Sequence, residues 1–234
     1  MKYALLVLFL VSESFSQTLQ LDYDLRYSID PQRNTKNFPS LIFEEWKGSD
    51  YGPFDFKTQA DMNGNNIGQI YIQAQQSLKF WKPDVYLFAE YSGGVGVADP
   101  GSFGYHIASA YSVGSSCLVL WQGAYFSPSI VYKYTAFNAP SHDAMFSLYW
   151  GRGFFDYRLT FSGDFEIWCE NKNHGDAPTA GLHGKRALFF GEPQLWYKIT
   201  EAFSLGARIN MYYHSLTYEN VLLVYPSVGI LYRF

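Results

Sequence analysis

Residues 221–234 read VLLVYPSVGILYRF, and an apolar or aromatic residue occupies every second position up to the last one. Phe234, Tyr232 and Ile230 belong to this series, whereas Arg233 stands between its members. Successive side chains of a β-strand point to opposite faces, so the stretch predicts a strand with one continuous apolar face. A strand that keeps this pattern to its terminal residue indicates an end held in a sheet, because a free terminus frays.

The same alternation is clearest near the N-terminus, in QTLQLDYDLRYSI at 17–29. The two faces of this segment are apolar and polar: Leu19, Leu21, Tyr23, Leu25, Tyr27 and Ile29 against Gln20, Asp22, Asp24, Arg26 and Ser28. The pattern returns in FDFKTQADM at 54–62, YRLTFSGDFEIW at 157–168 and SLGARINMYY at 204–213. Such strands build either a soluble sandwich, whose apolar faces meet in a core, or a barrel whose apolar face contacts lipid.

The N-terminus favours an exported protein. It reads MKYALLVLFLVSESFSQ, with Lys2 before an apolar run and small residues at Ser14 and Ser16. This layout predicts a secretory signal peptide over residues 1–16, cleaved before Gln17. No cysteine lies at the cleavage site, so lipoprotein processing is not indicated. The alternative is a buried core segment; the run is too short for a membrane-spanning helix, which needs about 20 residues. The mature domain is then 17–234.

Composition and the position of the aromatic residues favour the membrane barrel. Aromatic residues make up 20% of the chain and charged residues only 16%, against a typical quarter. The rings bracket every second turn: Trp46 to Phe54, Phe80 and Trp81, Trp150 with Phe154 and Phe155, Trp196 and Tyr197 with Phe203, and finally Tyr232 and Phe234. Aromatic rings settle at membrane–water interfaces, which predicts these turns at one end of a barrel. The net charge of −4 argues against nucleic-acid binding.

The connections alternate in length, as they do in outer-membrane barrels. Short turns such as KPD and GRG lie beside the aromatics, whereas DPQRNTKNFPS and NKNHGDAPTAGLHGKRA are long and polar. The exception is the apolar segment 114–127, which either extends two strands or forms a short surface helix. The fold class is therefore all-β, a transmembrane antiparallel β-barrel of about 12 strands in the bacterial outer membrane, in which the last strand, 221–234, should pair with the first. The predicted strands are 18–29, 38–47, 53–63, 68–81, 84–93, 104–114, 127–137, 143–151, 156–170, 187–200, 204–215 and 221–234.

Alternation also predicts which side chains face the interior. The predicted lumen lining, and so the candidate substrate-binding set, is Asp22, Asp24, Arg26, Asp55, Lys57, Asp61, Tyr86, Phe88, Glu90, Lys133, Arg158, Asp164, Glu166, Trp168, Glu192 and Arg208. Further inward rings are Tyr71, Tyr149, Trp196 and Tyr212.

About eight strands leave a filled interior and about 16 an open pore, so twelve leave room for a narrow channel. The charges either pair across the interior and fill it, or bind an amphipathic solute by stacking and hydrogen bonding. Both signs occur, which does not suit a general cation or anion pore.

Several strand segments resemble a known family. FDFKTQADM, SLKFWK, VYLFAEYSGG, IVYKYTAFNAPSHDAMFSLYW, LTFSGDFEIW and GEPQLWY are similar to strands of a Bacteroidetes-type outer-membrane family of uncharacterised function. That family is in turn similar to the Tsx-type nucleoside-specific channel-forming proteins. The resemblance covers essentially the whole mature chain, and it implies a monomeric twelve-stranded barrel that passes nucleosides. The terminal phenylalanine of this chain, Phe234, resembles the C-terminal signal by which the assembly machinery recognises outer-membrane barrels. Expected partners are thus membrane lipids, that machinery and a nucleoside-like solute.

Two other functions stay open. The first is a non-transporting structural or surface-binding barrel, with the loop 171–186 as its working part. The second is a lipid-modifying enzyme, with His106, His142, His174, His183 and His214 as the candidate bases. The sequence has no nucleophile motif, and Ser141-His142-Asp143 does not place a triad, because triad residues meet in space.

No cofactor or metal is predicted. Cys117 and Cys169 are widely spaced and lack the CxxC spacing of metal pairs, so unpaired thiols are the favoured interpretation over a disulfide.

Overall fold

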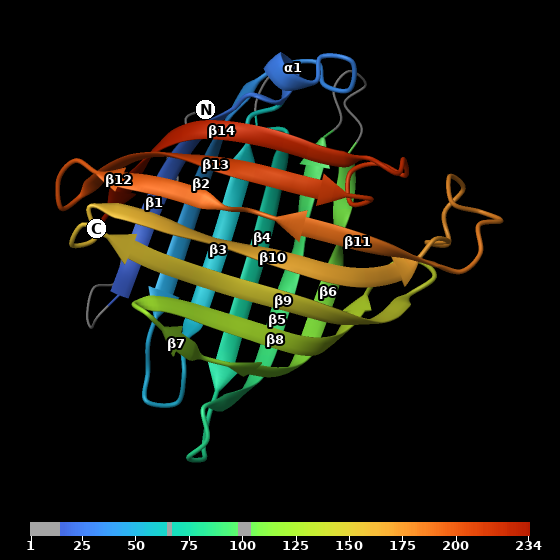
Figure 1. The fold of residues 1–234 in the computed structure, drawn as a ribbon. Helices are drawn as coiled ribbons and strands as arrows, with labels where there is room; N and C mark the ends of the chain where they lie inside the picture. The colour runs from blue at the N-terminus through green and yellow to red at the C-terminus, as the bar shows by residue number, and fades with distance from the viewer. Residues whose placement is uncertain (1–14, 65–66, 98–103) are drawn as a thin grey trace, which may run out of the picture.

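The computed structural model describes residues 15–64, 67–97 and 104–234, and these form one closed antiparallel β-barrel (Figure 1). Its strands are β1 (Phe15–Asp24), β2 (Phe38–Lys47), β3 (Phe54–Asp61), β4 (Gln69–Leu78), β5 (Val85–Val97), β6 (Gly104–Cys117), β7 (Val119–Trp121), β8 (Ala124–Thr135), β9 (Ser141–Phe154), β10 (Leu159–Asn171), β11 (Lys185–Gly191), β12 (Gln194–Lys198), β13 (Phe203–Tyr213) and β14 (Leu222–Arg233). A short helix, α1 (Arg26–Ile29), follows β1. The predicted signal peptide falls outside the described residues except for its last two, which begin β1.

The described strands occupy twelve positions in the wall, as predicted. Each strand pairs with its neighbours along the chain, and β9 joins β8 to β10. β11 and β12 share one position, because both pair with β10 on one side and β13 on the other. β7 is a short extension of the hairpin that leads into β8.

β14 closes the barrel against β1. The register runs from Thr18 opposite Arg233 to Asp24 opposite Ser227. Beyond the ladder, the backbone N–H of Phe234 donates to the carbonyl of Gln17 at 3.1 Å. The prediction that the apolar C-terminal stretch pairs with the first strand is confirmed. Closure satisfies both sheet edges, which a hydrocarbon surrounding requires.

The alternation of the sequence becomes an inside and an outside. On β1, Asp22 and Asp24 are buried in the interior, whereas Leu21 and Tyr23 are exposed on the outer wall. On β14 the exposed residues include Val228, which continues the same outer band. An apolar outer face around a polar interior is the arrangement of an outer-membrane barrel, because lipid contacts the outside and water the inside.

Several predicted strands differ in extent from the structure: GRG, predicted as a turn, lies inside β9, and two other strands differ most. The predicted strand 18–29 ends at Asp24, because the Asp24 carboxylate accepts the backbone N–H of Arg26 at 2.8 Å and turns the chain into α1. The predicted strand 187–200 is interrupted at Pro193, which has no N–H for the ladder. There the N–H of Glu192 donates to the carbonyl of Asp164, and the interruption leaves β11 and β12 as separate strands.

The apolar segment 114–127 extends two strands, which is one of the two outcomes left open by the sequence. β6 continues to Cys117, and β7 then pairs with the start of β8. Gln122 and Gly123 connect them with φ angles of 48° and 78°. Positive φ at both central positions defines the type I′ turn, whose twist matches that of a two-residue hairpin.

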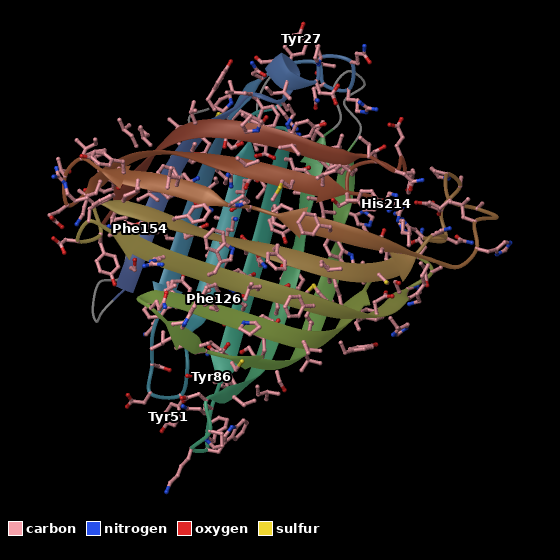
Figure 2. The ribbon with its side chains drawn as sticks, in the orientation of Figure 1. Tyr27, Tyr51, Tyr86, Phe126, Phe154 and His214 are labelled. Carbon is pink, nitrogen blue, oxygen red and sulfur yellow. The ribbon has the colours of Figure 1, made fainter. Side chains whose placement is uncertain are left out.

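The two ends of the barrel differ. Apart from the β7–β8 hairpin, the connections at the end that carries both termini are short, at 48–53, 79–84, 155–158 and 199–202. At the other end the described connections are mostly longer: 25–37, 62–68, 136–140, 172–184 and 214–221. Figure 2 shows Tyr27 and His214 towards the long-loop end, and Tyr51, Tyr86 and Phe154 towards the short-turn end. This asymmetry assigns the short turns to the periplasm and the long loops to the exterior.

The predicted aromatic residues lie at the periplasmic end. Trp46, Phe80, Phe155 and Phe203 are all exposed there, beside the short turns. Trp196 is different, since it is buried inside the wall and donates its indole N–H to Gln194 at 2.8 Å. In the part of the chain that the structure describes, no helix has the length and apolar character to span a membrane.

Candidate functional site

A cavity of about 860 Å³ occupies the barrel interior. Along β3 its lining runs from Asp61 to Asp55, and along β10 from Glu170 to Ser162, so it follows most of both strands. At about 3.4 Å per residue and a strand tilt near 45°, the β10 stretch covers roughly 19 Å along the barrel axis. An outer-membrane apolar band is about 25 Å tall. The cavity therefore extends through most of the membrane-spanning wall.

Buried ion pairs cross the interior on one side of this cavity. Lys57 on β3 donates to Glu192 at 2.8 Å, although the two residues are 135 positions apart in the chain. The guanidinium of Arg208, on β13, lies 3.0 Å from Glu192 and 3.0 Å from Asp22. The side chains of Arg208 and Asp22 are only 2% and 1% exposed, so each needs the other as a partner. The network links β3, β13 and β1 across the lumen.

A second group of charges lies at the outer mouth. Arg26 pairs with Asp24 at 2.9 Å, and its guanidinium also lies over the rings of Phe38 and Tyr225, at 4.6 and 4.9 Å. Arg26 therefore faces the interior as predicted from alternation, although it belongs to α1 and not to a strand. Its side chain returns to the lumen because Asp24, two residues earlier, is an inward residue of β1.

On the opposite side of the mouth, Glu170 binds Arg186 at 2.5 Å and His174 at 3.3 Å. The His174 ring stacks on Phe137 with 3.8 Å between centroids, which joins the connections 136–140 and 172–184. Within the longer connection, the Thr179 hydroxyl and backbone N–H donate to Asp176. These bonds hold the pKa of the Asp176 carboxyl below its usual range. Thr179 in turn accepts the backbone N–H of His174 at 2.9 Å, which orders the loop over the mouth.

The structure brings nine of the predicted lining residues together around the cavity: Arg26, Asp55, Lys57, Asp61, Lys133, Asp164, Glu166, Trp168 and Glu192. Five others are buried in the inner wall beside it: Asp22, Asp24, Phe88, Glu90 and Arg208. Phe88 forms a small apolar cluster with Val131, Met145 and Trp168, while Glu90 accepts a hydrogen bond from Gln73 at 3.1 Å. That any of them binds a solute stays a prediction.

Tyr86 and Arg158 differ from this group. Tyr86 is half-buried near the periplasmic end, with the Lys79 ammonium 5.2 Å from its ring centroid. Arg158 does not face the lumen, and its predicted place in the lining is wrong. It lies in the turn 155–158, is exposed, and its guanidinium sits 5.9 Å from the ring of Tyr197. The strand starts one residue later, so alternation does not apply at this position.

Sequence reasoning missed several charged or aromatic groups that line the cavity, among them Glu44, Phe137, Glu170 and Arg186. A signal existed for Glu170, because it continues the inward series of Glu166 and Trp168 on β10. Glu44 gives a weak signal, since the inward face of β2 also carries Phe38 and Ile42. Phe137 lies in a connection and Arg186 next to a loop, where period-two counting has no fixed starting point.

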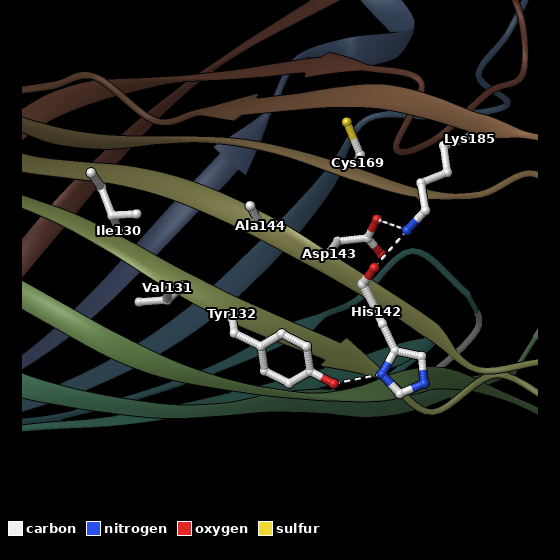
Figure 3. Close-up of a pocket in the computed structure, with 8 residues that line it drawn as sticks. All are labelled: Ile130, Val131, Tyr132, His142, Asp143, Ala144, Cys169 and Lys185. Carbon is white, nitrogen blue, oxygen red and sulfur yellow. Dashed lines mark hydrogen bonds and ion pairs between the residues drawn. The ribbon is translucent and has the colours of Figure 1, made fainter.

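A hollow of about 550 Å³ lies on the outer wall over β8, β9 and β10 (Figure 3). There His142 Nδ1 is 2.5 Å from the Tyr132 hydroxyl, and the Lys185 ammonium donates to the His142 carbonyl and to Asp143. The neighbouring Ser141 is buried and donates to Asp143 at 2.5 Å. The imidazole of His142 is thus on the outside while the Ser141 hydroxyl is inside, so Ser141, His142 and Asp143 do not form a catalytic triad.

Among the described residues, no group of three or more histidine, cysteine or acidic side chains could hold a metal ion. Cys117 on β6 and Cys169 on β10 are both free thiols.

The profile of a family described as a domain of unknown function, DUF5020, matches residues 16–230 of the chain. The chain belongs to the DUF5020 family. A search among curated proteins finds no match. Among solved structures, this DUF5020 protein is similar to the NanC porin, with a TM-score of 0.58 and 10% identity over 93% of this chain and 100% of that one. LpxR from Salmonella typhimurium has a TM-score of 0.49 at 8% identity, covering 94% of this chain and 100% of the other.

At this identity the likeness to the NanC porin shows the fold alone. The porin-like fold, the closed sheet and the apolar outer band together make the DUF5020 protein a bacterial outer-membrane β-barrel.

Proposed function

We propose that this DUF5020 protein is an outer-membrane channel for passive, selective diffusion of small amphipathic solutes, with nucleosides as the first class to test. One observation carries the proposal: the cavity follows β10 from Glu170 to Ser162, through most of the height of the wall. A solute that enters at the mouth then meets the same polar lining almost to the periplasmic end.

The chemistry of the lining supports an amphipathic solute. Tyr71, Tyr149 and Trp168 line the cavity, and a planar base can stack on the faces of such rings. Carboxylates beside them, such as Asp164 and Glu166, accept hydrogen bonds from hydroxyl or amino groups. Rings and carboxylates around one cavity suit a solute with one flat apolar part and several donors, as a nucleoside has.

The competing function is a non-transporting barrel, and the ion pairs of Lys57 and Arg208 across the lumen favour it. Planar-bilayer recording separates the two. We expect the purified protein to show single-channel conductance that nucleosides reduce at lower concentrations than sugars of similar mass. Absence of conductance contradicts the channel function. Equal block by nucleosides and sugars leaves a channel and removes the nucleoside preference.

We also propose that the barrel acts as a monomer in contact with membrane lipid, and that its last strand is read by the barrel assembly machinery. The outward residues of β14 support this, because Val224, Val228 and Ile230 are exposed in one row that leads to Phe234. Removing Phe234 should lower the amount of folded protein in the outer membrane, measured by heat-dependent migration on gels. Undiminished assembly of the shortened chain contradicts the proposal.

A further inference from the structure

The cations that line the cavity are almost all neutralised by partners. Arg26 pairs with Asp24, Lys57 with Glu192, and Arg186 with Glu170, at distances of 2.9, 2.8 and 2.5 Å. Lys133 is the exception: no ion pair engages it among the described residues. Its ammonium lies 4.2 Å from the ring of Trp168 and it is 7% exposed, so it packs in the wall.

The carboxylates of the same lining are not balanced in this way. Seven acidic residues line the cavity against four basic ones. Asp55, Asp61, Asp164 and Glu166 form no ion pair with any described residue. The groups left unpaired are thus four carboxylates and one ammonium, so the lining keeps an excess of negative charge.

Glu166 is the clearest example of a lining carboxylate that no described residue engages. It lies in the middle of β10, lines the cavity, and is only 9% exposed. No described residue donates a hydrogen bond to its carboxylate. The carboxylate borders the cavity, so a positively charged group that enters can form a charge-assisted hydrogen bond with it.

Aromatic rings stand beside these carboxylates. Tyr71 and Tyr149 belong to the same lining, on β4 and β9, whereas the ring of Trp168 on β10 already carries Lys133. The faces of such rings attract cations, most strongly where water is excluded. Carboxylates and ring faces therefore favour the same kind of solute, a cation that also has an apolar or aromatic part.

We infer that the lumen selects cations, and that among amphipathic solutes it binds those with a positively charged amine at Asp164 and Glu166. A ring or wall of carboxylates in a narrow passage concentrates cations and excludes anions, because the low-dielectric wall focuses the field into the water. The preference presupposes the channel function proposed above and narrows its solute class: an amine-bearing solute binds in preference to a neutral one of the same shape.

Reversal potentials test the selectivity. In a planar bilayer with a KCl gradient, the wild-type protein should favour K⁺ over Cl⁻, with a permeability ratio on the order of ten. The double variant D164N/E166Q should lose most of this preference. The matched control is D156N/E201Q, which makes the same chemical changes in the exposed periplasmic turns 155–158 and 199–202, outside the cavity lining. It should keep the wild-type ratio, because neither carboxylate lines the cavity and salt screens exposed charges.

Three solutes of one shape test the solute class. Tyramine carries an amine, tyrosol a hydroxyl and 4-hydroxyphenylacetate a carboxylate on the same phenol ring. Tyramine should block wild-type conductance at roughly tenfold lower concentration than tyrosol, the effect of one cation–π contact or a partly screened ion pair. 4-Hydroxyphenylacetate should block least. In D164N/E166Q the three solutes should become similar.

Several outcomes overturn the inference. A permeability ratio near or below one for the wild-type channel overturns it. Equal block by the three phenols also overturns it. In both cases the channel function itself is not contradicted. Calorimetric titration of tyramine into the folded protein is independent of conduction: no conductance together with tyramine binding overturns the channel and keeps the amine site. If D164N/E166Q does not fold, E166Q alone serves, because the Glu166 carboxylate has no partner among the described residues to lose.

Discussion

Charged residues of the same type differ in burial and in ion-pair partners from one position of this barrel to another. Arg208 is almost fully buried and holds Asp22 and Glu192 together, whereas Arg158, also placed in the lumen by alternation, is exposed in a turn. Burial makes the difference energetically, because a buried charge without a partner is far more costly than an exposed one. The same residue type therefore contributes to stability at one position and little at the other.

Arg208→Met should destabilise the barrel by about 3–5 kcal/mol, because it leaves Asp22 and Glu192 buried without their shared cation. Urea unfolding in lipid vesicles measures the loss. The matched control is Arg158→Met, which removes only the contact with Tyr197 and should cost less than about 1 kcal/mol. Equal losses in the two variants would show that the buried network does not hold the wall together.

At the scale of elements, the closing pair of strands leaves little room on its inner side. Gly229 of β14 lies opposite Asp22 of β1 and Gly206 of β13. A Cβ atom at Gly229 would come within 2.1 Å of an Asp22 carboxylate oxygen and 2.8 Å of the Leu21 carbonyl oxygen. Glycine there lets the Asp22 side chain lie across the strand and reach Arg208.

Gly229→Ala should destabilise the closed barrel by about 1–3 kcal/mol, because the added methyl group must displace the β1 backbone. The urea midpoint, followed by heat-dependent gel migration, reports the change. Gly104→Ala on β6 is the control, since the nearest atom to its Cβ lies 3.9 Å away. A wild-type midpoint for Gly229→Ala would mean that β1 and β14 adjust freely.

At the scale of the whole molecule, apolar residues that are exposed in the isolated protein face two different surroundings, lipid and water. Ile130 in the middle of β8 is 70% exposed, and Ile29 at the end of α1 is 59% exposed. In the barrel orientation derived from the loops, Ile130 contacts hydrocarbon while Ile29 lies outside it in water. The outer band is therefore stabilised by lipid rather than by a protein core.

Ile130→Arg should lower the free energy of unfolding in lipid vesicles by about 2–4 kcal/mol, the cost of an arginine near the bilayer midplane. Ile29→Arg should stay within about 0.5 kcal/mol of wild type, as surface substitutions do. Equilibrium unfolding of both variants in the same vesicles makes the comparison. If the two substitutions cost the same, the outer face of β8 does not contact lipid.

Much of this architecture follows from the chain alone. The period of two in 17–24 and 221–234 predicted both which faces are apolar and that the last strand meets the first. Alternation is a local property of an extended backbone, so a reader of the sequence can count it without knowing the neighbours. Its failures are local as well: at Asp24, where a side chain turns the backbone, at Pro193, which cannot donate, and at Arg158, which precedes its strand.

The balance of charge in the lumen was decided only by the tertiary structure. The sequence shows acids and bases on the inner face, which indicated a mixed lining. Closure of the wall brings Lys57 to Glu192 and Arg208 to Asp22, and so neutralises these bases while Asp164 and Glu166 remain without an ion pair. Pairing across the lumen depends on which strands face each other and at what height, and those quantities belong to the closed sheet rather than to any one strand.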